Sequence, residues 1–458
     1  MSNPGDADTT PITSVQQLAD HIAGGGKPRE AWRIGTEHEK FGFRRANLAP
    51  PPYEPNGIRA MLDGMAGYAW EPIMDDGNPI GLKGTGPHKG ASISLEPGGQ
   101  FELSGAPLRT LHETKAEFDT HFAELAQVAG PLGFGFAPLG FHPLARREDM
   151  PWMPKSRYAI MRRYMQTVGS MGLDMMLRTC TVQVNLDYAD EADMRRKLRV
   201  SLALQPLATA LFANSPFTEG RPNGFLSMRA HVWTDVDPAR TGAPALMFAE
   251  DFGFERFVHW LLDMPMYFIL RNGRYIDLAG RSFRDFMAGH LDNVTGGQVA
   301  TVGDFADHMT VAFTDVRLKR FLEMRGADAG SPAMMLAQSA FWVGLLYDEQ
   351  ALSEADALVR SHPWQDYADL RAAVPRLAMD APWQDGTLRT LAKEVICIAS
   401  RGLRSRNEKD ASDEDESRYL DPIVEIADGA RTQAECWLDR YTSKWGMDAG
   451  QMLVEAVA

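Results

Sequence analysis

The chain has 458 residues, of which 44% are hydrophobic and 24% charged, and its formal net charge is −14. This length and apolar content suffice for a large folded core, whereas the negative charge argues against nucleic acid as the main partner, because phosphate binding needs a basic surface. No segment approaches the roughly 18 consecutive apolar residues of a membrane-spanning helix, so we expect no membrane partner.

The N-terminal sequence MSNPGDADTTPITS is polar and acidic, without the basic start and apolar stretch of a secretory signal. We therefore expect a disordered leader over residues 1–12 and a cytoplasmic location. Residues 13–458 are expected to form a single catalytic domain, with a helical C-terminal part over about 332–458. Three scattered cysteines, none in a Cys-x-x-Cys pair, indicate neither a disulfide framework nor a zinc site.

Capping signals and hydrophobic periodicity predict the elements in chain order. Residues 13–16 and 110–113 resemble capping boxes that open helices, and 192–212 is typical of a buried helix. Strands are expected over 33–43, 134–141, 176–188 and 317–325, and Asn272-Gly273 between two apolar runs predicts a hairpin. Strands in the middle and helices at the end are typical of an α+β fold with antiparallel pairing.

The segment RIGTEHEKFGF (33–43) carries two carboxylates on one face of its predicted strand. Side chains alternate along a strand, so Glu37 and Glu39 point the same way, about 6–7 Å apart. A solvent-facing polar stripe has the same pattern, but Phe41 and Phe43 share this face and indicate partial enclosure. Enclosed carboxylates repel each other unless a cation lies between them, so the spacing suits two neighbouring hard metal ions.

Further polar side chains follow in three other segments. In ASISLEPGGQFELSG (91–105) a Pro-Gly-Gly turn would bring Glu96 near Glu102, although two exposed glutamates flanking a loop would look the same. In RTCTVQVNLDY (178–188) the polar face, with Gln183 and Asn185, indicates either a wet sheet face or the lining of a polar funnel. In RLKRFLEMR (317–325) one side carries Arg317, Lys319, Phe321, Glu323 and Arg325.

Together these segments offer oxygen ligands from several strands, with arginines beside them. Hard oxygen ligands favour Mg²⁺ or Mn²⁺ over zinc, and Mg²⁺ beside arginine is what phosphoryl transfer needs. The glycine-rich stretch 84–90 contains Pro87 and runs into a predicted strand instead of a helix, so it does not indicate a dinucleotide-binding fold.

Long stretches of the sequence closely resemble the plant and proteobacterial type of glutamate–cysteine ligase, the first enzyme of glutathione biosynthesis. They are RIGTEHEKFGF, SISLEPGGQFELSGAPL, GLDMMLRTCTVQVNLD, ALQPLATALFANSPFTEGRPNGFLSMRAHVWTD, RLKRFLEMRGAD and FWVGLLYD. The resemblance is dense over roughly residues 30–350 and looser in the helical C-terminus. It implies a glutamine-synthetase-like α+β fold, in which a curved, mainly antiparallel sheet forms a half-open funnel with helices packed outside.

The resemblance also implies the ligands and their residues. ATP, L-glutamate and L-cysteine would be the small-molecule substrates, with Mg²⁺, or Mn²⁺ as a possible substitute, as the cofactor. The implied metal ligands are Glu37, Glu39, Glu102, Gln183 and Glu323, with Glu96 as an addition. Arg325 would contact the transferring phosphoryl group and Arg229 a glutamate carboxylate, with Arg240 and Asn185 as weaker substrate-binding candidates.

Plant members of the family carry a regulatory cysteine pair, and the corresponding positions here hold Lys115 and approximately Leu336. A thiol switch through that pair is therefore not expected. Two alternatives stay open: a ligase of the same fold that uses a different amine acceptor, and a metal-binding or scaffolding protein without catalysis. The sequence alone indicates no oligomeric state and no adenine-binding residues.

Overall fold

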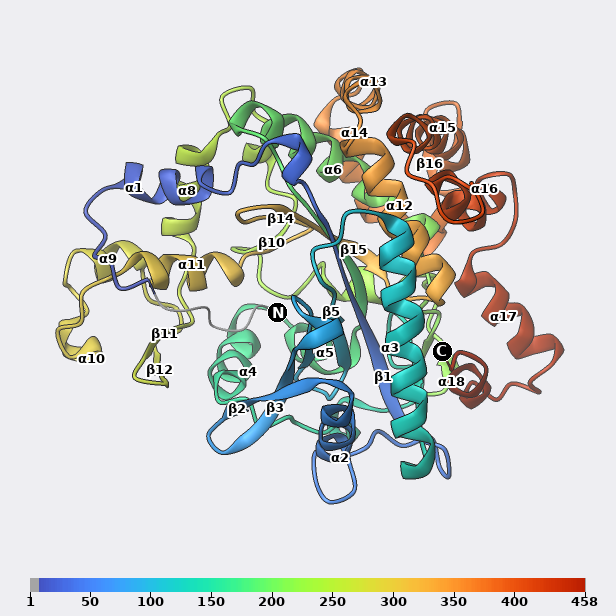
Figure 1. The fold of residues 1–458 in the computed structure, drawn as a ribbon, viewed down its shortest axis with the longest axis horizontal. Coiled ribbons are helices and arrows are strands. Elements are labelled where there is room, and N and C mark those ends of the chain that lie inside the picture. The colour runs from blue at the N-terminus through green and yellow to red at the C-terminus, as the bar shows by residue number, and fades with distance from the viewer. Residues whose placement is uncertain (1–7, 458) are drawn as a thin grey trace.

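The computed structural model describes residues 8–457 and contains one large antiparallel sheet with helices around it (Figure 1). The strand order is β14-β15-β7-β1-β5-β4-β3-β2, and β6 also pairs with β1. These nine strands are β1 (Ile34–Arg44), β2 (Trp70–Asp75), β3 (Asn78–Gly84), β4 (Ser92–Leu95), β5 (Phe101–Ser104), β6 (Phe134–Ala137), β7 (Thr181–Leu186), β14 (Val316–Leu318) and β15 (Leu322–Asp328). Strands β2 and β14 form the two edges, so the described sheet is open.

Strand β1 is the centre of this sheet and has two chemically different faces. Residues 34–38 pair with β7, 37–40 with β5 and 41–44 with β6. On one face, Thr36 hydrogen-bonds Ser339 of α12 (Pro332–Leu346), and His38 packs edge-on against Phe118 of α3 (Leu111–Leu132). The two glutamates predicted from the alternation lie on the other face.

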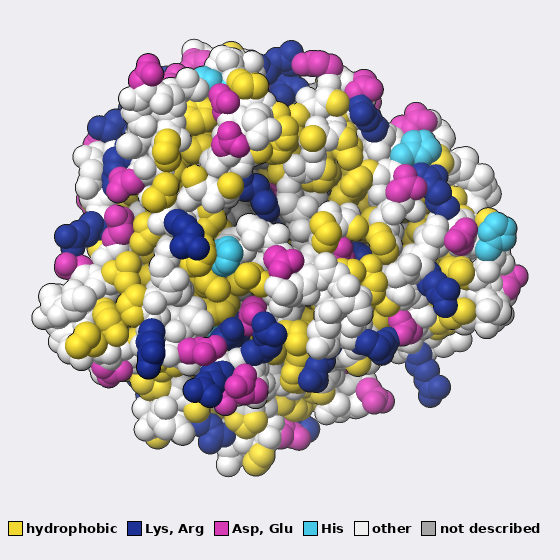
Figure 2. All heavy atoms as spheres, turned by 180° about the vertical axis from the view of Figure 1, so that it is seen from behind, with side chains coloured by type: hydrophobic (Ala, Val, Ile, Leu, Met, Phe, Trp, Pro, Cys, Tyr) yellow, Lys and Arg dark blue, Asp and Glu magenta, His cyan; other side chains and the backbone are white. Residues whose placement is uncertain are grey.

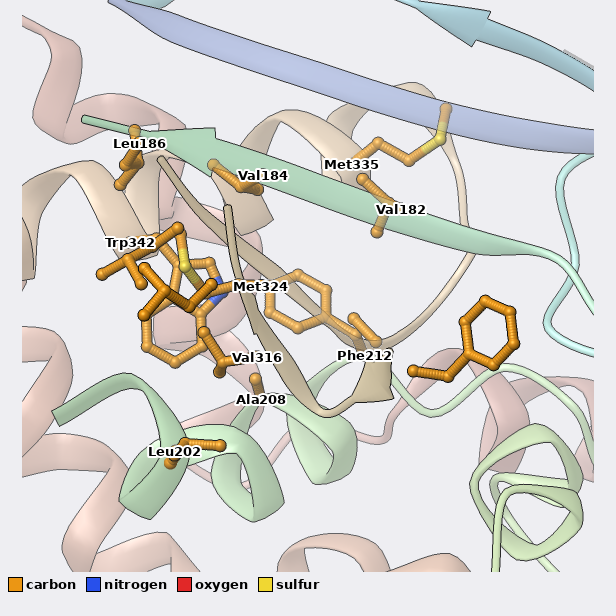
Figure 3. Close-up of a cluster of buried hydrophobic side chains, with 14 of the residues drawn as sticks. Val182, Val184, Leu186, Leu202, Ala208, Phe212, Val316, Met324, Met335 and Trp342 are labelled. Atoms are coloured by element: carbon orange, nitrogen blue, oxygen red, sulfur yellow. The ribbon is translucent and has the colours of Figure 1, made fainter. Parts of the chain in front are cut away.

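The apolar core lies between the sheet and a group of long helices. Figure 3 shows Val182, Val184 and Leu186 of β7 pointing toward Trp342 of α12 and Met324 of β15. Every residue from Met334 to Leu346 in α12 is buried, which is typical of a helix enclosed on all sides. The helices that complete this layer are α6 (Glu191–Leu211), α13 (Glu349–Arg360), α14 (Trp364–Leu377), α15 (Leu388–Arg406) and α16 (Asp421–Ala427).

The remaining elements surround this core. The helices are α1 (Val15–Ala23), α2 (Ile58–Met65), α4 (Arg157–Val168), α5 (Gly172–Arg178), α7 (Met228–Val232), α8 (Phe254–Asp263), α9 (Phe283–Met287), α10 (Asp292–Thr295), α11 (Val302–Thr310), α17 (Gln433–Ser443) and α18 (Gly450–Glu455). Four small sheets pair β8 (Phe217–Thr218) with β9 (Arg221–Pro222), β10 (Thr241–Gly242) with β13 (Phe313–Thr314), β11 (Phe268–Arg271) with β12 (Arg274–Asp277), and β16 (Pro382–Trp383) with β17 (Gly386–Thr387).

Several local predictions are confirmed. Thr110 and Glu113 form a complete capping box at the start of α3. The Asn272-Gly273 pair joins β11 to β12, and both residues have positive φ, as the two-residue hairpin requires. Helix α6 covers the predicted buried helix, and from Pro332 onward the described elements are helices apart from the β16–β17 hairpin.

Other predictions need correction. The stretch 317–325, expected as one strand, turns at 319–321 and belongs to the β14–β15 hairpin, which pairs Arg317 with Glu323. Residues 176–178 end α5 instead of starting β7. The first helix is capped by Ser14, one residue later than predicted.

Of the expected leader, residues 1–7 lie outside the described residues. Residues 8–12 lie beside the start of α11. Ile12 N donates to Ala300 O at 3.0 Å, and Gly303 N donates to Asp8 O at 2.9 Å. This part is therefore held by backbone hydrogen bonds, where disorder was expected. The division into a leader and one catalytic domain stays a prediction.

Two further observations concern the surface and the helices. On the face shown in Figure 2, Lys and Arg side chains are interspersed with Asp and Glu and form no extended basic area. Within residues 8–457, no helix combines the length and the apolar character that crossing a bilayer would require.

Candidate active site

Strand register brings the predicted carboxylates together on one face of the sheet. Glu37 of β1 lies opposite Gln183 of β7, and Glu39 lies opposite Glu102 of β5. Directly opposed residues in antiparallel strands are close neighbours on the same face. Glu39 and Glu102 are 8% and 0% exposed, so this face is not a solvent-facing stripe. We call the face formed by Glu37, Glu39, Glu102, Gln183, Asn185 and Glu323 the carboxylate face.

The amides of β7 connect two strands of the carboxylate face. Gln183 Nε2 donates to Glu37 Oε2 at 3.2 Å, and Asn185 Nδ2 donates to Glu37 Oε1 at 2.7 Å. Asn185 in turn lies opposite Glu323 of β15. Burial raises the pKa of Glu37, and the nearby Glu323 charge raises it further.

The Glu39 carboxyl lies among other carboxylates of the site. Its Oε2 accepts a hydrogen bond from Thr181 N at 2.9 Å. Burial and the neighbouring Glu96 and Glu102 raise the pKa of Glu39 well above its usual value, although Arg229 opposes this shift. Negative charge is therefore in excess around Glu39.

Glu323, in contrast to Glu39, is surrounded by positively charged side chains. Its carboxylate pairs with Arg317 at 2.5 Å, with Lys319 at 2.6 Å and with Arg325. Burial alone would raise the pKa of Glu323, but these three cations outweigh burial and hold the pKa well below its usual value. Arg325 also donates to Gln183 Oε1, which links β15 to β7.

Glu96 and Glu102 are joined by the predicted turn. Glu102 lies in β5 and accepts a hydrogen bond from Ser104 Oγ at 2.5 Å. Glu96 follows β4, and its backbone N donates to Gln100 O at 3.0 Å, which closes the turn. The prediction that these two glutamates lie near each other therefore agrees with the structure.

Arg229 reaches the site from outside the large sheet. It lies in α7, whose N-cap Ser227 donates to Asp328 of β15 at 2.8 Å. The Arg229 side chain is buried, and its Nη2 donates to Arg325 O at 2.7 Å. Strand β15 and the short helix α7 thus place Arg325 and Arg229 beside the carboxylate face.

Arg240 does not join this group. Its fully buried guanidinium donates to Asp237 at 2.5 Å and to Pro265 O at 2.8 Å, and it lies 4.1 Å from the Tyr267 ring centroid. These internal partners argue against the substrate-binding role that the resemblance suggested. A buried Asp-Arg pair three residues apart is a structural contact that the sequence pattern alone could not distinguish from a ligand contact.

Two adjacent pockets border the carboxylate face. The first, which we call the Glu39 pocket, is lined by residues that include Glu39, Glu96, Gln100, Met161, Met175, Met176, Thr179, Thr181 and Gln183. The second, the Arg371 pocket, is lined by residues that include Pro206, Thr209, Thr314, Asp315, Gly326, Arg371 and Val374. Arg229, Trp233, Phe313 and Arg325 line both and form the shared wall.

The fit of the carboxylate face to a metal ion depends on two observations. Its oxygen donors suit hard cations, and the raised pKa of Glu39 marks a position where an added positive charge is favourable. Within residues 8–457, however, no group of three or more His, Cys, Asp or Glu side chains is arranged to hold a metal ion as it stands. The Glu323 carboxylate is already paired with three cations, Arg317, Lys319 and Arg325.

Sequence reasoning assigned no role to several residues at the site. The alternation placed Arg317 and Lys319 on the side of Glu323 but assigned them no role. Asp315 and Arg371 form an ion pair across 56 positions of the chain, and no local pattern connects them. Trp233 lies four residues after Arg229, a spacing that would have placed both on one helical face if α7 had been expected.

Comparison with curated proteins gives relatives over nearly the whole chain. The chloroplastic glutamate–cysteine ligase of Brassica juncea is 49% identical over 448 residues, which are 98% of this chain and 84% of that protein. That of Medicago truncatula is 50% identical over 438 residues, covering 95% and 84%. The expected cytoplasmic location is contradicted by these names, because the relatives are chloroplastic proteins.

Among solved structures, the glutamate–cysteine ligase of Francisella tularensis in complex with AMP has a TM-score of 0.55 at 12% identity. The match covers 93% of this chain and 87% of that chain. At this identity the likeness shows the fold alone, and it confirms the expected α+β class with a mainly antiparallel sheet.

A sequence model of one protein family matches residues 33–456, which include every candidate residue discussed above. Its description is glutamate–cysteine ligase family 2, in agreement with the names of both plant relatives. The chain belongs to glutamate–cysteine ligase family 2.

Proposed function

We propose that the protein joins the amine of L-cysteine to the γ-carboxylate of L-glutamate with hydrolysis of ATP to ADP and phosphate, the first step of glutathione biosynthesis. The observation that carries this proposal is the carboxylate face, where four strands place carboxylates and amides in register beside Arg229 and Arg325. Membership of the ligase family supports the same reaction.

The proposed cofactor is Mg²⁺, for which Mn²⁺ can substitute. Glu37, Glu39, Glu102, Gln183 and Glu323 would hold it, with Glu96 as an additional ligand. When bound, the ion would neutralise charge on the phosphates of ATP. The carboxylates around Glu39 support this assignment, because burial and their repulsion raise its pKa and a cation there would offset that repulsion.

The proposed chemistry has two steps. A γ-carboxylate oxygen of glutamate attacks the terminal phosphorus of ATP, the bond to the bridging oxygen breaks, and ADP leaves. The neutral amine of cysteine then attacks the carbonyl carbon of γ-glutamyl phosphate; the bond from that carbon to the phosphate oxygen breaks, phosphate leaves and the amine loses a proton. Both steps move negative charge between oxygens, so the protein acts mainly by positioning and charge stabilisation.

The chain's own residues take distinct parts in this scheme. Arg325 would contact the transferring phosphoryl group, since its guanidinium already lies between Gln183 and Glu323 on the carboxylate face. Arg229 would bind a carboxylate of glutamate, and Asn185, whose amide now donates to Glu37, is a weaker candidate for a substrate contact.

The experiment is ADP release by purified protein with Mg²⁺, ATP and glutamate, with and without cysteine, together with mass analysis of the product. We expect cysteine to stimulate ADP release and γ-glutamylcysteine to form in equal amount. Other amino acids and ammonia, tested as competing amines, separate this reaction from a ligase of the same fold with another acceptor. ADP release that cysteine does not stimulate would rule out the proposal.

A further inference from the structure

The pairing of β1 with β7 ends at an inserted side chain. If the antiparallel register of the two strands continued, it would place Arg33 opposite Asp187. Instead, the Asp187 backbone N donates to the Tyr347 hydroxyl at 2.7 Å, and this hydroxyl donates to Arg33 O at 2.5 Å. The Tyr347 hydroxyl therefore lies between the two strand ends and joins backbone groups that would pair directly in a regular ladder. We call this arrangement the Tyr347 bridge.

Other contacts hold the Tyr347 bridge in place. Arg33 N donates to Asp187 Oδ2 at 2.7 Å, so the Asp187 side chain supplies a second link between the strand ends. Lys27 Nζ contacts Asp187 Oδ1 at 2.7 Å. Tyr347 is 2% exposed, and the centroid of its ring lies 4.8 Å from that of the Trp32 ring. The bridge is therefore buried and fixed by partners on both strands.

The Tyr347 bridge lies close to the amides of the carboxylate face. Two residues further along each strand, Gly35 of β1 lies opposite Asn185 of β7. Asn185 Nδ2 donates to Glu37 Oε1 at 2.7 Å, and Gln183 Nε2 donates to Glu37 Oε2 at 3.2 Å. The separation of the strands at the bridge therefore affects how the β7 amides meet the Glu37 carboxylate.

Tyr347 itself is placed away from the proposed substrates. It directly follows α12, which packs on the opposite face of β1, where Thr36 hydrogen-bonds Ser339. It lines neither the Glu39 pocket nor the Arg371 pocket. Without its hydroxyl, a buried N–H and a buried C=O would lose their partner, which costs free energy unless the strand ends move together. An effect of Tyr347 on the reaction must therefore pass through β1 and β7.

We propose that Tyr347 is a positioning residue for the ligase reaction. Its hydroxyl sets the separation of β1 and β7, and thereby the geometry in which Glu37 and Gln183 hold the metal ion. This inference rests on the proposed function and adds a residue that acts on the carboxylate face from behind the sheet. The effect falls on metal binding, because both bridged strands carry proposed metal ligands.

The test compares two variants that each lose one buried hydroxyl. Tyr347→Phe removes the bridge and keeps the aromatic ring. Tyr367→Phe is the matched control, because Tyr367 is also 2% exposed and its hydroxyl also donates to a backbone oxygen, Val359 O at 3.1 Å. That contact joins α14 to α13 and does not involve the large sheet.

The first readout is the binding of Mn²⁺ to the protein without nucleotide, followed by electron paramagnetic resonance of the free ion. The dissociation constant should rise by roughly 10- to 100-fold in Tyr347→Phe, the range for groups that orient metal ligands, and stay unchanged in Tyr367→Phe. The concentration of Mg²⁺ that gives half-maximal ADP release should rise with it, whereas the KM for cysteine should not change.

The second readout is amide hydrogen exchange, measured by mass spectrometry on peptides that contain Asp187. Exchange at Asp187 should become faster in Tyr347→Phe and not in Tyr367→Phe, because only the first variant removes the acceptor of this N–H. This readout depends on neither metal nor activity, so it tests the bridge separately from the reaction.

The outcomes are distinct. An unchanged dissociation constant for Mn²⁺ in Tyr347→Phe, an equal rise in Tyr367→Phe, or unchanged exchange at Asp187 would overturn the inference. If Tyr347→Phe does not fold, Trp32→Phe decides: it loosens the packing on the Tyr347 ring and should raise the same constant, and an unchanged constant there would also overturn the inference. Failure of the wild type to bind Mn²⁺ or to form γ-glutamylcysteine would instead contradict the proposed function.

Discussion

Glu39 and Glu323 lie on the same face of the sheet, yet their surroundings differ in sign. Burial and neighbouring carboxylates raise the pKa of Glu39, whereas Arg317, Lys319 and Arg325 outweigh burial and lower the pKa of Glu323. Identical side chains are therefore expected to respond differently to the same substitution. In the proposed function Glu39 would bind an added cation, whereas Glu323 is already paired with Arg317, Lys319 and Arg325.

Glu39→Gln should lower kcat by at least roughly 100-fold, because a missing ligand to the cation removes several kcal/mol of transition-state stabilisation. Stability should not fall. Removing a charge that burial and Glu96 disfavour should leave the free energy of unfolding at pH 7 equal or higher in the absence of Mg²⁺. Steady-state ADP release and urea unfolding check this; parallel losses of activity and stability would mark Glu39 as structural.

Glu323→Gln should lose both activity and stability. The substitution leaves Arg317, Lys319 and Arg325 without their counter-charge, and breaking a buried ion pair on one side costs about 3–5 kcal/mol. Urea unfolding measures this loss. A variant as stable as the wild type would show that the three cations find other partners.

At the scale of elements, α3 is connected to the segment after β5 through the half-buried Glu117. Glu117 of α3 accepts from Ala106 N at 2.8 Å. A Cβ at Gly105 would lie 2.3 Å from Glu117 Oε2 and 2.8 Å from the backbone O of Thr36, so a larger residue there would force the backbone to shift. Burial raises the pKa of Glu117 to about 7. This contact fixes how α3 lies against the strand that carries Glu102.

The Glu117 contact should make stability depend on pH. Between about pH 4.5 and 7 the folded state holds a proton on Glu117 that the unfolded state has lost, so the free energy of unfolding falls as pH rises through this window. Glu117→Gln keeps an acceptor for Ala106 and should remove this part of the slope, stabilising the protein at pH 8 by on the order of 1–3 kcal/mol. Equal slopes in the two proteins, measured by urea unfolding at several pH values, would contradict the account.

Elements were predictable where local chemistry determines them. The capping box at Thr110 and the Asn272-Gly273 turn depend on residues a few positions apart, and both were found from the sequence. The β14–β15 hairpin was missed because its turn, Lys319 to Phe321, contains no Gly, Pro or Asn. Its formation depends on tertiary pairing, which local residue preferences do not report.

For the whole molecule, the active site depends on strands that are distant in sequence. The carboxylate face collects side chains from residue 37 to residue 323, so only the assembled sheet forms it. Alternation predicted which residues of each segment share a face. It could not give the register that sets Glu39 against Glu102, nor the ion pairs of Asp315 and Glu323, because those depend on three-dimensional packing.

The most direct test of the account is a crystal of the protein grown with Mn²⁺, a non-hydrolysable ATP analogue and glutamate, measured at the manganese absorption edge. The account predicts anomalous peaks within coordination distance of Glu37, Glu39, Glu102 and Glu323, with the nucleotide phosphates beside them. Peaks at other residues, with Glu323 still paired to Arg317 and Arg325 and no ion near Glu39, would contradict it.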